Sequence, residues 1–315
     1  MLCLDLLSED PAFNLATEEY LLINSAEEYF ILYIDSPSVI IGKHQAAHRE
    51  TNTEYVTKND IPVIRRISGG GTVYHDQGNL NFSFILNSSA GSQVNFRKYT
   101  LPVLEFLSSA GIVARLEGKS DLRVNGEKIS GNAEHVFRER VLHHGTLLFN
   151  SDLEKLKSAL RKDTSHYVTR AVTSNPAPVV NLADLLPSLS EIHSFRTLML
   201  DFLLKKKGNI LSELRTEDFD QIEIIAKNRY RSWEWNYAYG PEYSLENKLE
   251  INGEQFKLKL SVKDGLITDC QIKSSREFLT AGEKLKGCRH MPEDIREVLR
   301  QEEMQMQESD VFRFF

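Results

Sequence analysis

Residues 65–85 read "RRISGGGTVYHDQGNLNFSFI", and the fold around this stretch must explain three consecutive glycines. Arg65 and Arg66 lead into the glycines, and a strand-like segment carrying His75 and Asp76 follows. Such a run either forms a tight turn with positive φ or lets another group come close to the backbone. The arginines favour the second interpretation, because a guanidinium beside bare backbone N–H groups makes a concavity that binds a carboxylate or a phosphate.

The glycine run matches neither of the common nucleotide-binding motifs. A P-loop carries a lysine directly after its last glycine, whereas Thr72 follows here. The dinucleotide fingerprint carries a third glycine at its sixth position, where Tyr74 stands. The sequence therefore predicts an anion site of a different kind.

The segments around the glycine run mix strand and helix signals. Asp10 before Pro11 is typical of a helix N-cap and first helical position. Residues 50–60 favour a helix or a loop. Apolar and β-branched runs predict strands at residues 30–34, 38–42, 63–66 and 81–86.

The C-terminal quarter predicts a separate antiparallel meander over residues 242–270. Asn252-Gly253 marks a hairpin there, since both residues of a tight two-residue turn adopt positive φ, and "VKDGLI" adds a further turn. A helix over residues 292–302 is expected to cover the meander. Its buried stripe would be Ile295, Val298 and Leu299.

A Gly-Pro break in "NYAYGPEYSL" indicates a domain boundary near residue 240. We expect one domain over residues 1–238 and a second over residues 242–315. Strands and helices are intermixed in both, so the expected fold class is α/β (α+β), with mixed sheets in the first domain and a small α+β second domain.

Composition limits the partners and the compartment. The net charge of 38 − 45 = −7 argues against a protein that holds nucleic acid through its overall field. The three cysteines, Cys3, Cys270 and Cys288, do not have the spacing of metal ligands and are too few to stabilise a chain of this length through disulfide bonds. Their number favours a reducing, cytoplasmic compartment. The N-terminus is interrupted by charge and no apolar run is long enough to span a bilayer, so we expect neither a signal peptide nor a membrane contact.

A hairpin at residues 121–133, "DLRVNGEKISGNA", provides an independent constraint. With Asn125-Gly126 as its two-residue turn, the charged or polar side chains of one face are expected to be Asp121, Arg123, Lys128 and Ser130. Arg123 opposite Lys128 is an unfavourable pair unless the side chains splay into water or an anion lies near. The small residues of "SGNA" that follow favour the anion.

Five segments together resemble the lipoate-protein ligase family, in that family's order and over nearly the whole chain. They are "SPSVIIGKHQ" (36–45), the opening stretch, the hairpin "DLRVNGEKISGNA", "HHGTLLFNSDLEKL" (143–156) and "SWEWNYAYGPEYS" (232–244). The resemblance implies the fold shared by biotin and lipoate protein ligases, followed by a C-terminal accessory domain. It also implies a two-step activity: lipoate and ATP give lipoyl-adenylate and pyrophosphate, and a lysine of an acceptor protein then takes the lipoyl group.

The resemblance implies a site as well, with Lys128 as the central catalytic residue at the acyl-phosphate anhydride. Asp121 would contact Lys128 or help to position the Mg²⁺ that accompanies ATP. His75 with Asp76, and His143 with His144, have no serine or cysteine partner beside them, which favours positioning over acid-base work. The implied substrate- and ATP-binding residues are Arg66, Ser68, Gly69, Gly70, Gly71, Thr72, Val73, Tyr74, His75, Asp76, Asp121, Lys128, Gly131 and Ala133.

The implied partners are lipoyl-accepting proteins, namely the E2 lipoyl domains of 2-oxoacid dehydrogenases and the H protein of glycine cleavage. One segment departs from the family. Bacterial ligases commonly carry Ser-Val-Arg-Ser-Arg-Val-Thr-Asn-Leu where this chain reads "SNPAPVVNL" (174–182), with Pro176 and Pro178 at the arginine positions. Arg170 is a candidate replacement a few residues upstream.

The departure leaves an alternative open, a lipoyl or octanoyl transferase that uses a preformed activated acyl group. A cysteine-dependent transferase is disfavoured, because the first domain offers only Cys3. A lipoyl-binding scaffold without catalysis is disfavoured by the intact glycine run and the Lys128 hairpin.

Overall fold

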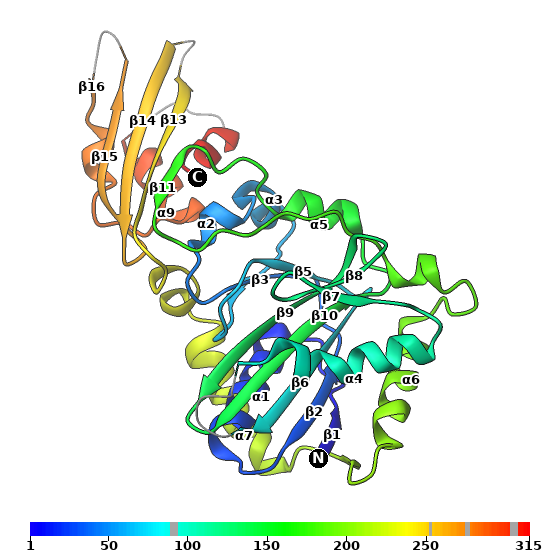
Figure 1. Cartoon of the computed structure of the whole chain (residues 1–315). Coiled ribbons are helices and arrows are strands. Elements are labelled where there is room, and N and C mark those ends of the chain that lie inside the picture. Colours follow the sequence, from blue (N-terminus) through cyan, green and yellow to red (C-terminus); the bar gives the residue numbers. More distant parts are fainter. Residues whose placement is uncertain (89–93, 252–253, 275–277, 303–307) are drawn as a thin grey trace.

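The structure is a computed structural model that describes residues 1–88, 94–251, 254–274, 278–302 and 308–315. Within this part of the chain the strands form sheets of eight, five and three strands. Figure 1 shows the five-stranded sheet at one end of an elongated molecule, with the other two sheets in the larger part.

An eight-stranded mixed sheet forms the centre of the larger part. Its strand order is β12 (Ile210–Ser212), β1 (Leu2–Asp5), β2 (Tyr29–Tyr33), β6 (Asn79–Asn87), β10 (Arg140–Leu148), β9 (Glu127–Phe137), β8 (Asp121–Val124) and β7 (Arg115–Glu117). β12, β1 and β2 are parallel, and every later pair is antiparallel. All five residues of β2 are buried, as expected for a strand that is covered on both faces.

The three-stranded sheet holds the glycine run. Its order is β4 (Val63–Arg65), β3 (Ser38–Ile41) and β5 (Val73–His75), with β3 parallel to β4 and antiparallel to β5. The glycines lie in the connection between β4 and β5, which we call the glycine loop (residues 66–72). Both of its ends are therefore fixed to the same central strand.

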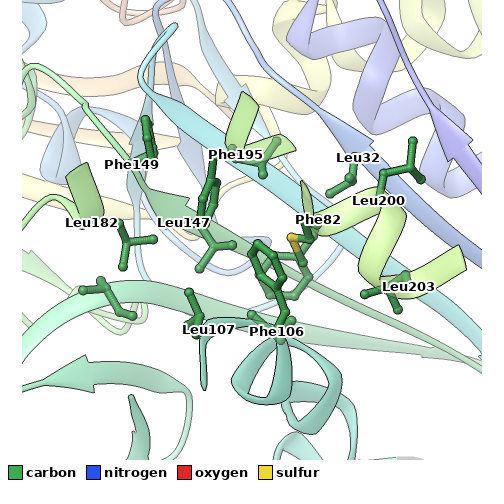
Figure 2. Packing of buried hydrophobic residues seen from close by; sticks show 14 of the residues in the cluster. Leu32, Phe82, Phe106, Leu107, Leu147, Phe149, Leu182, Phe195, Leu200 and Leu203 are labelled. Atoms are coloured by element: carbon green, nitrogen blue, oxygen red, sulfur yellow. The ribbon is translucent and has the colours of Figure 1, made fainter. Parts of the chain in front are cut away.

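Two hydrophobic cores cover the two faces of the large sheet. Side chains alternate along a strand, so Phe30 and Leu32 of β2 enter one core while Ile31 and Tyr33 enter the other. In the first core, α4 (Phe96–Ser109) and α6 (Ile192–Leu204) pack against the sheet, and Figure 2 shows Phe106 and Phe195 beside Phe82 and Leu147. Each such fully buried side chain contributes about 1.5–3 kcal/mol.

The second core lies under α1 (Pro11–Asn24), α7 (Thr216–Ile225) and a short π-helix, η2 (Ala226–Tyr230). Asp10 caps α1 by accepting the N–H of Ala12 at 2.9 Å, as the sequence predicts. The remaining helices of the larger part are α2 (Ala47–Glu50), α3 (Thr53–Lys58), α5 (Leu153–Ala159), the 3₁₀ turn η1 (Leu182–Leu185) and the π-helix η3 (Glu234–Ala238).

The C-terminal sheet has the order β11 (Tyr167–Thr169), β13 (Tyr243–Ile251), β14 (Glu254–Lys263), β15 (Leu266–Lys273) and β16 (Phe278–Leu279). A third core fills the space between this sheet and its helices. These helices are α8 (Ala281–Lys284), α9 (Pro292–Gln301) and η4 (Glu308–Phe314). The expected helix over residues 292–302 is confirmed, and of its predicted stripe Ile295 and Leu299 are buried while Val298 is partly buried.

The predicted strands of the larger part are present within a residue or two of their expected bounds. The Asn125-Gly126 turn is confirmed by positive φ at both residues, 52° and 85°. The Asn252-Gly253 turn lies outside the described residues, although β13 and β14 pair on either side of it. No helix among the described residues is both long and apolar enough to cross a bilayer.

The division at residues 238 and 242 remains a prediction. η3 ends at Ala238 and β13 begins at Tyr243, so the chain changes sheets at that point. However, β11 pairs with β13 and comes from residues 167–169, so the earlier part of the chain supplies a strand to the C-terminal sheet.

Candidate active site

A cavity of about 460 Å³ is lined by residues of the glycine loop and β5 and by residues of β8, β9 and β10. Ten of the fourteen predicted binding residues line it: Arg66, Gly70, Gly71, Thr72, Val73, His75, Asp121, Lys128, Gly131 and Ala133. The topology thus brings the glycine loop and the Lys128 hairpin, about 60 residues apart in the sequence, to one cavity.

Two glycines of the glycine loop are explained by contacts and backbone geometry within the protein. Gly70 has φ +91°, a conformation that favours glycine. A Cβ on Gly71 would lie 3.2 Å from the hydroxyl oxygen of Ser174, and a Cβ on Gly42 would collide with the carbonyl of Gly70. Positive φ therefore accounts for Gly70 and close packing against Ser174 for Gly71, while Gly69 has open space around its Cβ position.

The two arginines before the loop have opposite roles, so the expectation that both form an anion site is wrong for Arg65. Arg65 is fully buried, and its guanidinium donates to the carbonyls of Gly42, Lys43 and Gln45 and of Trp235 and Asn236. Four of its five N–H groups are used in tying residues 42–45 to residues 235–236. Arg65 does not line the cavity.

Arg66 lines the cavity and shapes the glycine loop. Its Nη2 donates to the carbonyls of Gly69 and Gly71, both at 2.7 Å, its Nη1 to Ile40 and its Nε to Ser68. Four of the five N–H groups that a guanidinium carries are therefore used inside the protein. Burial lowers the pKa of Arg66 to about 10, which leaves the group cationic at neutral pH.

The Lys128 hairpin carries a bulge that changes the expected register. Arg123 pairs with Lys128 as predicted, but Leu122 then pairs with Ser130 and Asp121 with Gly131. The extra residue moves the side chains beyond it to the opposite face, so the expectation that Ser130 shares the polar face is wrong. Ser130 is fully buried instead.

Asp121 lies between two cations. One carboxylate oxygen is 2.9 Å from the Lys128 ammonium and the other is 3.0 Å from the Arg123 guanidinium. The side chain of Lys128 is 22% exposed, so water or a ligand can reach it. Gly131 lies beneath the ammonium, because a Cβ at this position would be 3.2 Å from Lys128 Nζ.

A buried hydrogen-bond chain supports the cavity wall behind Arg66. Ser68 Oγ contacts His144 Nε2 at 2.6 Å, and His144 Nδ1 contacts Glu18 at 2.8 Å. Tyr33 and Ser83 also donate to Glu18. Burial alone would raise the pKa of Glu18, but the interaction with His144 and these hydrogen bonds outweigh it and lower the pKa. A buried carboxylate is thus matched to the buried cation of Arg66.

His75 forms a second histidine-carboxylate pair on the cavity wall. Its Nδ1 lies 2.7 Å from Asp35, and the same carboxylate accepts from the side chains of Asn14 and Asn81. Asp35 is fully buried, and His75 is 4% exposed. Sequence reasoning missed Asp35, which lies in the turn between β2 and β3.

Four predicted residues do not line the cavity. Ser68 and Gly69 support it from behind through Arg66. Tyr74 packs in a separate core with Val39 and Val63, because it points to the opposite face of β5 from Val73 and His75. Asp76 instead accepts the N–H groups of Gly78 and Asp152 and so fixes a turn.

Residues 172–181, which we call the strap, border the cavity at Ser174 and Asn175 and include the departure from the family pattern. Lys128 N–H donates to the Pro178 carbonyl at 2.9 Å, and Val180 N–H donates to the Lys128 carbonyl at 3.1 Å. Ser174 accepts from Thr72 N–H and donates to Glu50. The strap therefore joins the glycine loop to the hairpin, while Arg170, the predicted replacement, does not line the cavity.

A comparison with family models identifies this arrangement. Residues 10–204 match the lipoyl protein ligase A/B catalytic domain. The chain belongs to the lipoate-protein ligase family. The match spans the glycine loop, the Lys128 hairpin, the strap and both histidine-carboxylate pairs on the cavity wall. The biotin and lipoate ligase fold that the sequence predicts is confirmed.

Curated members of the ligase family cover most of the chain. A lipoate-protein ligase 1 of Staphylococcus aureus is 37% identical over 97% of this chain and 93% of its own length. A lipoate-protein ligase of Bacillus subtilis is 40% identical over 84% of this chain and 81% of its own. A solved lipoate-protein ligase A bound with ATP has a TM-score of 0.64 at 26% identity, covering 75% of this chain and 98% of the other.

His144 has the positioning role that the sequence favours, since it lies between Ser68 and Glu18. Sequence reasoning did not single out several other lining residues: Leu15 of α1, Tyr33, Ile40, Asn81, Asn132 and Thr146 of the strands, and Ser174 of the strap. Alternation along β6 and β10 indicates which residues share a face, but strand partners must be known before that face can be assigned to the cavity.

Proposed function

We propose that this protein is an ATP-dependent lipoate-protein ligase that makes lipoyl-adenylate from lipoate and ATP and transfers the lipoyl group to a lysine of an acceptor protein. The observation that carries the proposal is the cavity in which the Lys128 ammonium faces the glycine loop. The family relationship supports it, and a related ligase A binds ATP.

The volume and lining of the cavity suit these substrates. About 460 Å³ falls within the usual range of small-molecule pockets, roughly 300–1,000 Å³. Leu15, Ile40 and Val73 supply apolar wall for an acyl tail, while Arg66 and Lys128 supply positive charge for a carboxylate and phosphates.

Lys128 would act electrostatically in both half-reactions. Its ammonium reduces the repulsion between the lipoate carboxylate and the α-phosphate as the carboxylate attacks, and it then stabilises the oxyanion that forms when the acceptor lysine attacks. Asp121 would hold Lys128 in place until an anionic substrate takes over that contact. Ligand binding by the other cavity residues predicted from the sequence is part of the same proposal.

Mg²⁺ would enter with ATP rather than occupy a protein cage. The described residues hold no cluster of three or more metal-ligating side chains, and Mg²⁺ in ATP sites is commonly held by one or two carboxylates and the phosphates. Asp121 and Glu117 are carboxylates of the cavity lining, and Asp121 would be free to hold Mg²⁺ once the phosphates take over its contacts with Lys128 and Arg123.

We also propose the acceptors and the organisation of the chain. E2 lipoyl domains and the glycine cleavage H protein would supply the acceptor lysine. The three cysteines are unpaired, which supports a cytoplasmic location. Residues 1–238 would form the catalytic domain and residues 242–315 the accessory domain.

The second candidate is a lipoyl or octanoyl transferase that uses a preformed activated acyl group. Pro176 and Pro178 favour it, because they stand at the positions of two family arginines in a strap that borders the cavity and pairs with Lys128. Arg66, Lys119, Arg123 and Lys128 still line the cavity, which favours the ligase.

Two parallel assays on one lipoyl-domain acceptor separate the candidates. One receives lipoate with Mg-ATP, and the other receives synthetic lipoyl-adenylate. Modification of the acceptor in both is the expected result. Modification only with the preformed adenylate would leave a transferase, and modification in neither would remove both candidates.

A further inference from the structure

Three arginines that the sequence singles out differ in how many of their N–H groups the protein itself uses. Arg65 and Arg66 each use four of the five inside the protein. Arg123 uses two among the described residues, since it donates to the Gly126 carbonyl at 2.9 Å and to Asp121 at 3.0 Å. Its side chain is 20% exposed and lines the cavity. Arg123 therefore keeps donors that a ligand in the cavity can reach.

Arg123 is also the middle member of a row of three cations. β8 lies between β7 and β9, and Arg123 pairs directly with Arg115 on one side and with Lys128 on the other. Residues paired in this way share a face, with Cβ atoms about 4.5–5.5 Å apart, and like charges there are destabilising. Asp121 forms ion pairs with Lys128 and with Arg123, so one carboxylate faces two cations and Arg115 adds a third. The row therefore keeps an excess of positive charge that suits an anion.

The charges of the cavity lining gather at the same end of the large sheet. Among the described residues the lining carries four cations and two carboxylates, namely Arg66, Lys119, Arg123, Lys128, Glu117 and Asp121. All but Arg66 come from β7, β8, β9 and the turn between β7 and β8. The positive excess at this end suits a ligand that carries more than one negative charge, and phosphate groups are the anions that arginine binds most specifically.

The apolar lining of the cavity lies toward β2, away from Arg123. It belongs to the second core, which includes the β2 side chains Ile31 and Tyr33, and it consists of Leu15, Ile40 and Val73. Val73 Cγ1 lies 3.9 Å from the Cβ position of Gly131 in β9, and Lys128 Nζ lies 3.2 Å from the same position. Arg123 lies one strand farther out in the order β2, β6, β10, β9, β8. The apolar lining and Arg123 are therefore on opposite sides of Lys128.

The geometry of adenylation gives these two sides different roles. The attacking and leaving oxygens stand roughly in line at the reacting phosphorus. The proposed function puts that phosphorus beside Lys128, with the lipoate carboxylate arriving from the apolar lining. The leaving pyrophosphate then lies on the opposite side, toward β8 and β7, where Arg123 is available.

We infer that Arg123 is a catalytic residue of the first half-reaction and binds the β- and γ-phosphates of ATP, a role that rests on the proposed function. An oxygen of the lipoate carboxylate bonds to the α-phosphorus. The bond from that phosphorus to the oxygen that bridges to the β-phosphate breaks, and pyrophosphate leaves with the electron pair. The planar guanidinium, with phosphate oxygens in place of Asp121, binds two oxygens of the leaving group and meets the charge that develops there. Transfer to the acceptor lysine involves no pyrophosphate, so Arg123 serves only the first step.

The test measures the two half-reactions separately on the full chain, in single turnover. The first forms lipoyl-adenylate from lipoate and Mg-ATP, and the second transfers the lipoyl group from synthetic lipoyl-adenylate to a lipoyl-domain acceptor. Arg123→Met removes the charge but keeps a long side chain, and we expect the first rate to fall about 100-fold, the scale of one lost transition-state donor. The second rate should stay within about threefold of wild type.

Two further variants calibrate this result. Arg123→Lys should give a first rate between those of Arg123→Met and the wild type, because it keeps the charge but not the planar fork. Arg300→Met is the matched control, since Arg300 is an exposed arginine that pairs with Glu297 and does not line the cavity. Both of its rates should equal those of the wild type.

Pyrophosphate itself provides a second readout. The wild type, given lipoyl-adenylate and magnesium pyrophosphate, should form ATP by the reverse reaction, and Arg123→Met should need at least about tenfold more pyrophosphate for half of its maximal rate. An unchanged pyrophosphate requirement, or a first rate within about threefold of wild type, would overturn the inference.

Equal losses in the two half-reactions would also overturn it, because they would mean that Arg123 only holds Asp121 and Lys128 in place. If Arg123→Met does not fold, the same comparison is made with Arg123→Lys. A wild type that transfers the lipoyl group from the adenylate but makes none from ATP would overturn the ligase proposal, and the inference with it.

Discussion

The cavity and the joint between the two parts of the chain both bury polar side chains, but some in the cavity keep an unpaired atom whereas both histidines of the joint are fully paired. We define the joint as His48, Tyr167, Tyr243, His290 and Phe315. His48 bonds Thr53 and the His290 carbonyl, and His290 bonds Tyr243 and the Phe314 carbonyl, so each ring nitrogen has a partner. In the cavity, His75 Nε2 and Asn132 Oδ1 have none.

This difference in hydrogen-bond pairing separates residues that stabilise the fold from residues that serve ligand binding. Complete pairing in the joint stabilises the folded chain, and ring stacking of His290 on Phe315 at 4.4 Å adds to it. Unpaired buried atoms in the cavity lower the stability of the free protein and are matched only when ligands bind. Substitutions in the cavity should therefore change turnover, and those in the joint should change the free energy of unfolding.

The largest effect is expected from Lys128→Ala. Loss of the ammonium removes the electrostatic stabilisation of both transition states, so acceptor lipoylation should fall about 100- to 1,000-fold. The thermal midpoint should stay within a few degrees of wild type, because the side chain is partly exposed. Lys58→Ala is the control, since Lys58 forms an exposed pair with Glu54 and does not line the cavity. Retention of half the wild-type rate would remove Lys128 from the mechanism.

Gly131→Val should give the next largest effect. The new side chain would occupy the space beneath Lys128 and displace its ammonium. A misplacement of about 1 Å can cost up to about 100-fold in rate, so we expect at least a tenfold loss by the same assay. Gly69→Ala is the matched change, because its Cβ would meet open space. Equal losses in the two variants would mean that the glycines serve only the backbone.

The sequence predicts local features well because local chemistry determines them. Asp10 caps α1 and Asn125-Gly126 turns the hairpin wherever the rest of the chain lies. The glycine loop and Lys128 could be singled out because bare backbone and a crowded charged face are visible in the sequence.

The supporting residues could not be predicted in this way. Asp35 and Glu18 act on His75 and His144 from 40 and 126 residues away, so their roles depend on strand order. The bulge in β9 moved Ser130 to the buried face although the turn was predicted correctly. One polar residue closing an apolar strand, as Asp35 does in "YIDSP", is the signal that could have indicated a buried carboxylate.

In the joint, His48→Phe should lower stability without changing turnover. Phenylalanine keeps the ring contacts with Tyr237 and Phe315 but leaves the His290 carbonyl and the Thr53 hydroxyl without their partner. An unsatisfied buried group costs about 1–3 kcal/mol, which urea unfolding measures. His193→Phe, at an exposed position of α6, should change stability far less. A slower transfer rate per folded molecule would show that the joint acts on the cavity.

The joint also makes the stability of the protein depend on pH. Burial lowers the pKa of His290 from 6.5 to about 4, with the nearby Arg161 acting in the same direction against the hydrogen bond to Phe314. The folded protein therefore binds fewer protons than the unfolded chain between these values. This stability is complete above pH 6.5 and is lost as the pH falls toward 4, by up to about 1.4 kcal/mol per pH unit. Burial lowers the pKa of His48 as well, so both histidines contribute to this loss of stability at low pH.

Urea unfolding at pH 7.5, 6 and 5 should give a shallower loss of stability with falling pH for His290→Phe than for the wild type. Parallel losses in the two proteins would mean that His290 is not held neutral, and the contrast between a satisfied joint and an open cavity would then rest on the cavity alone.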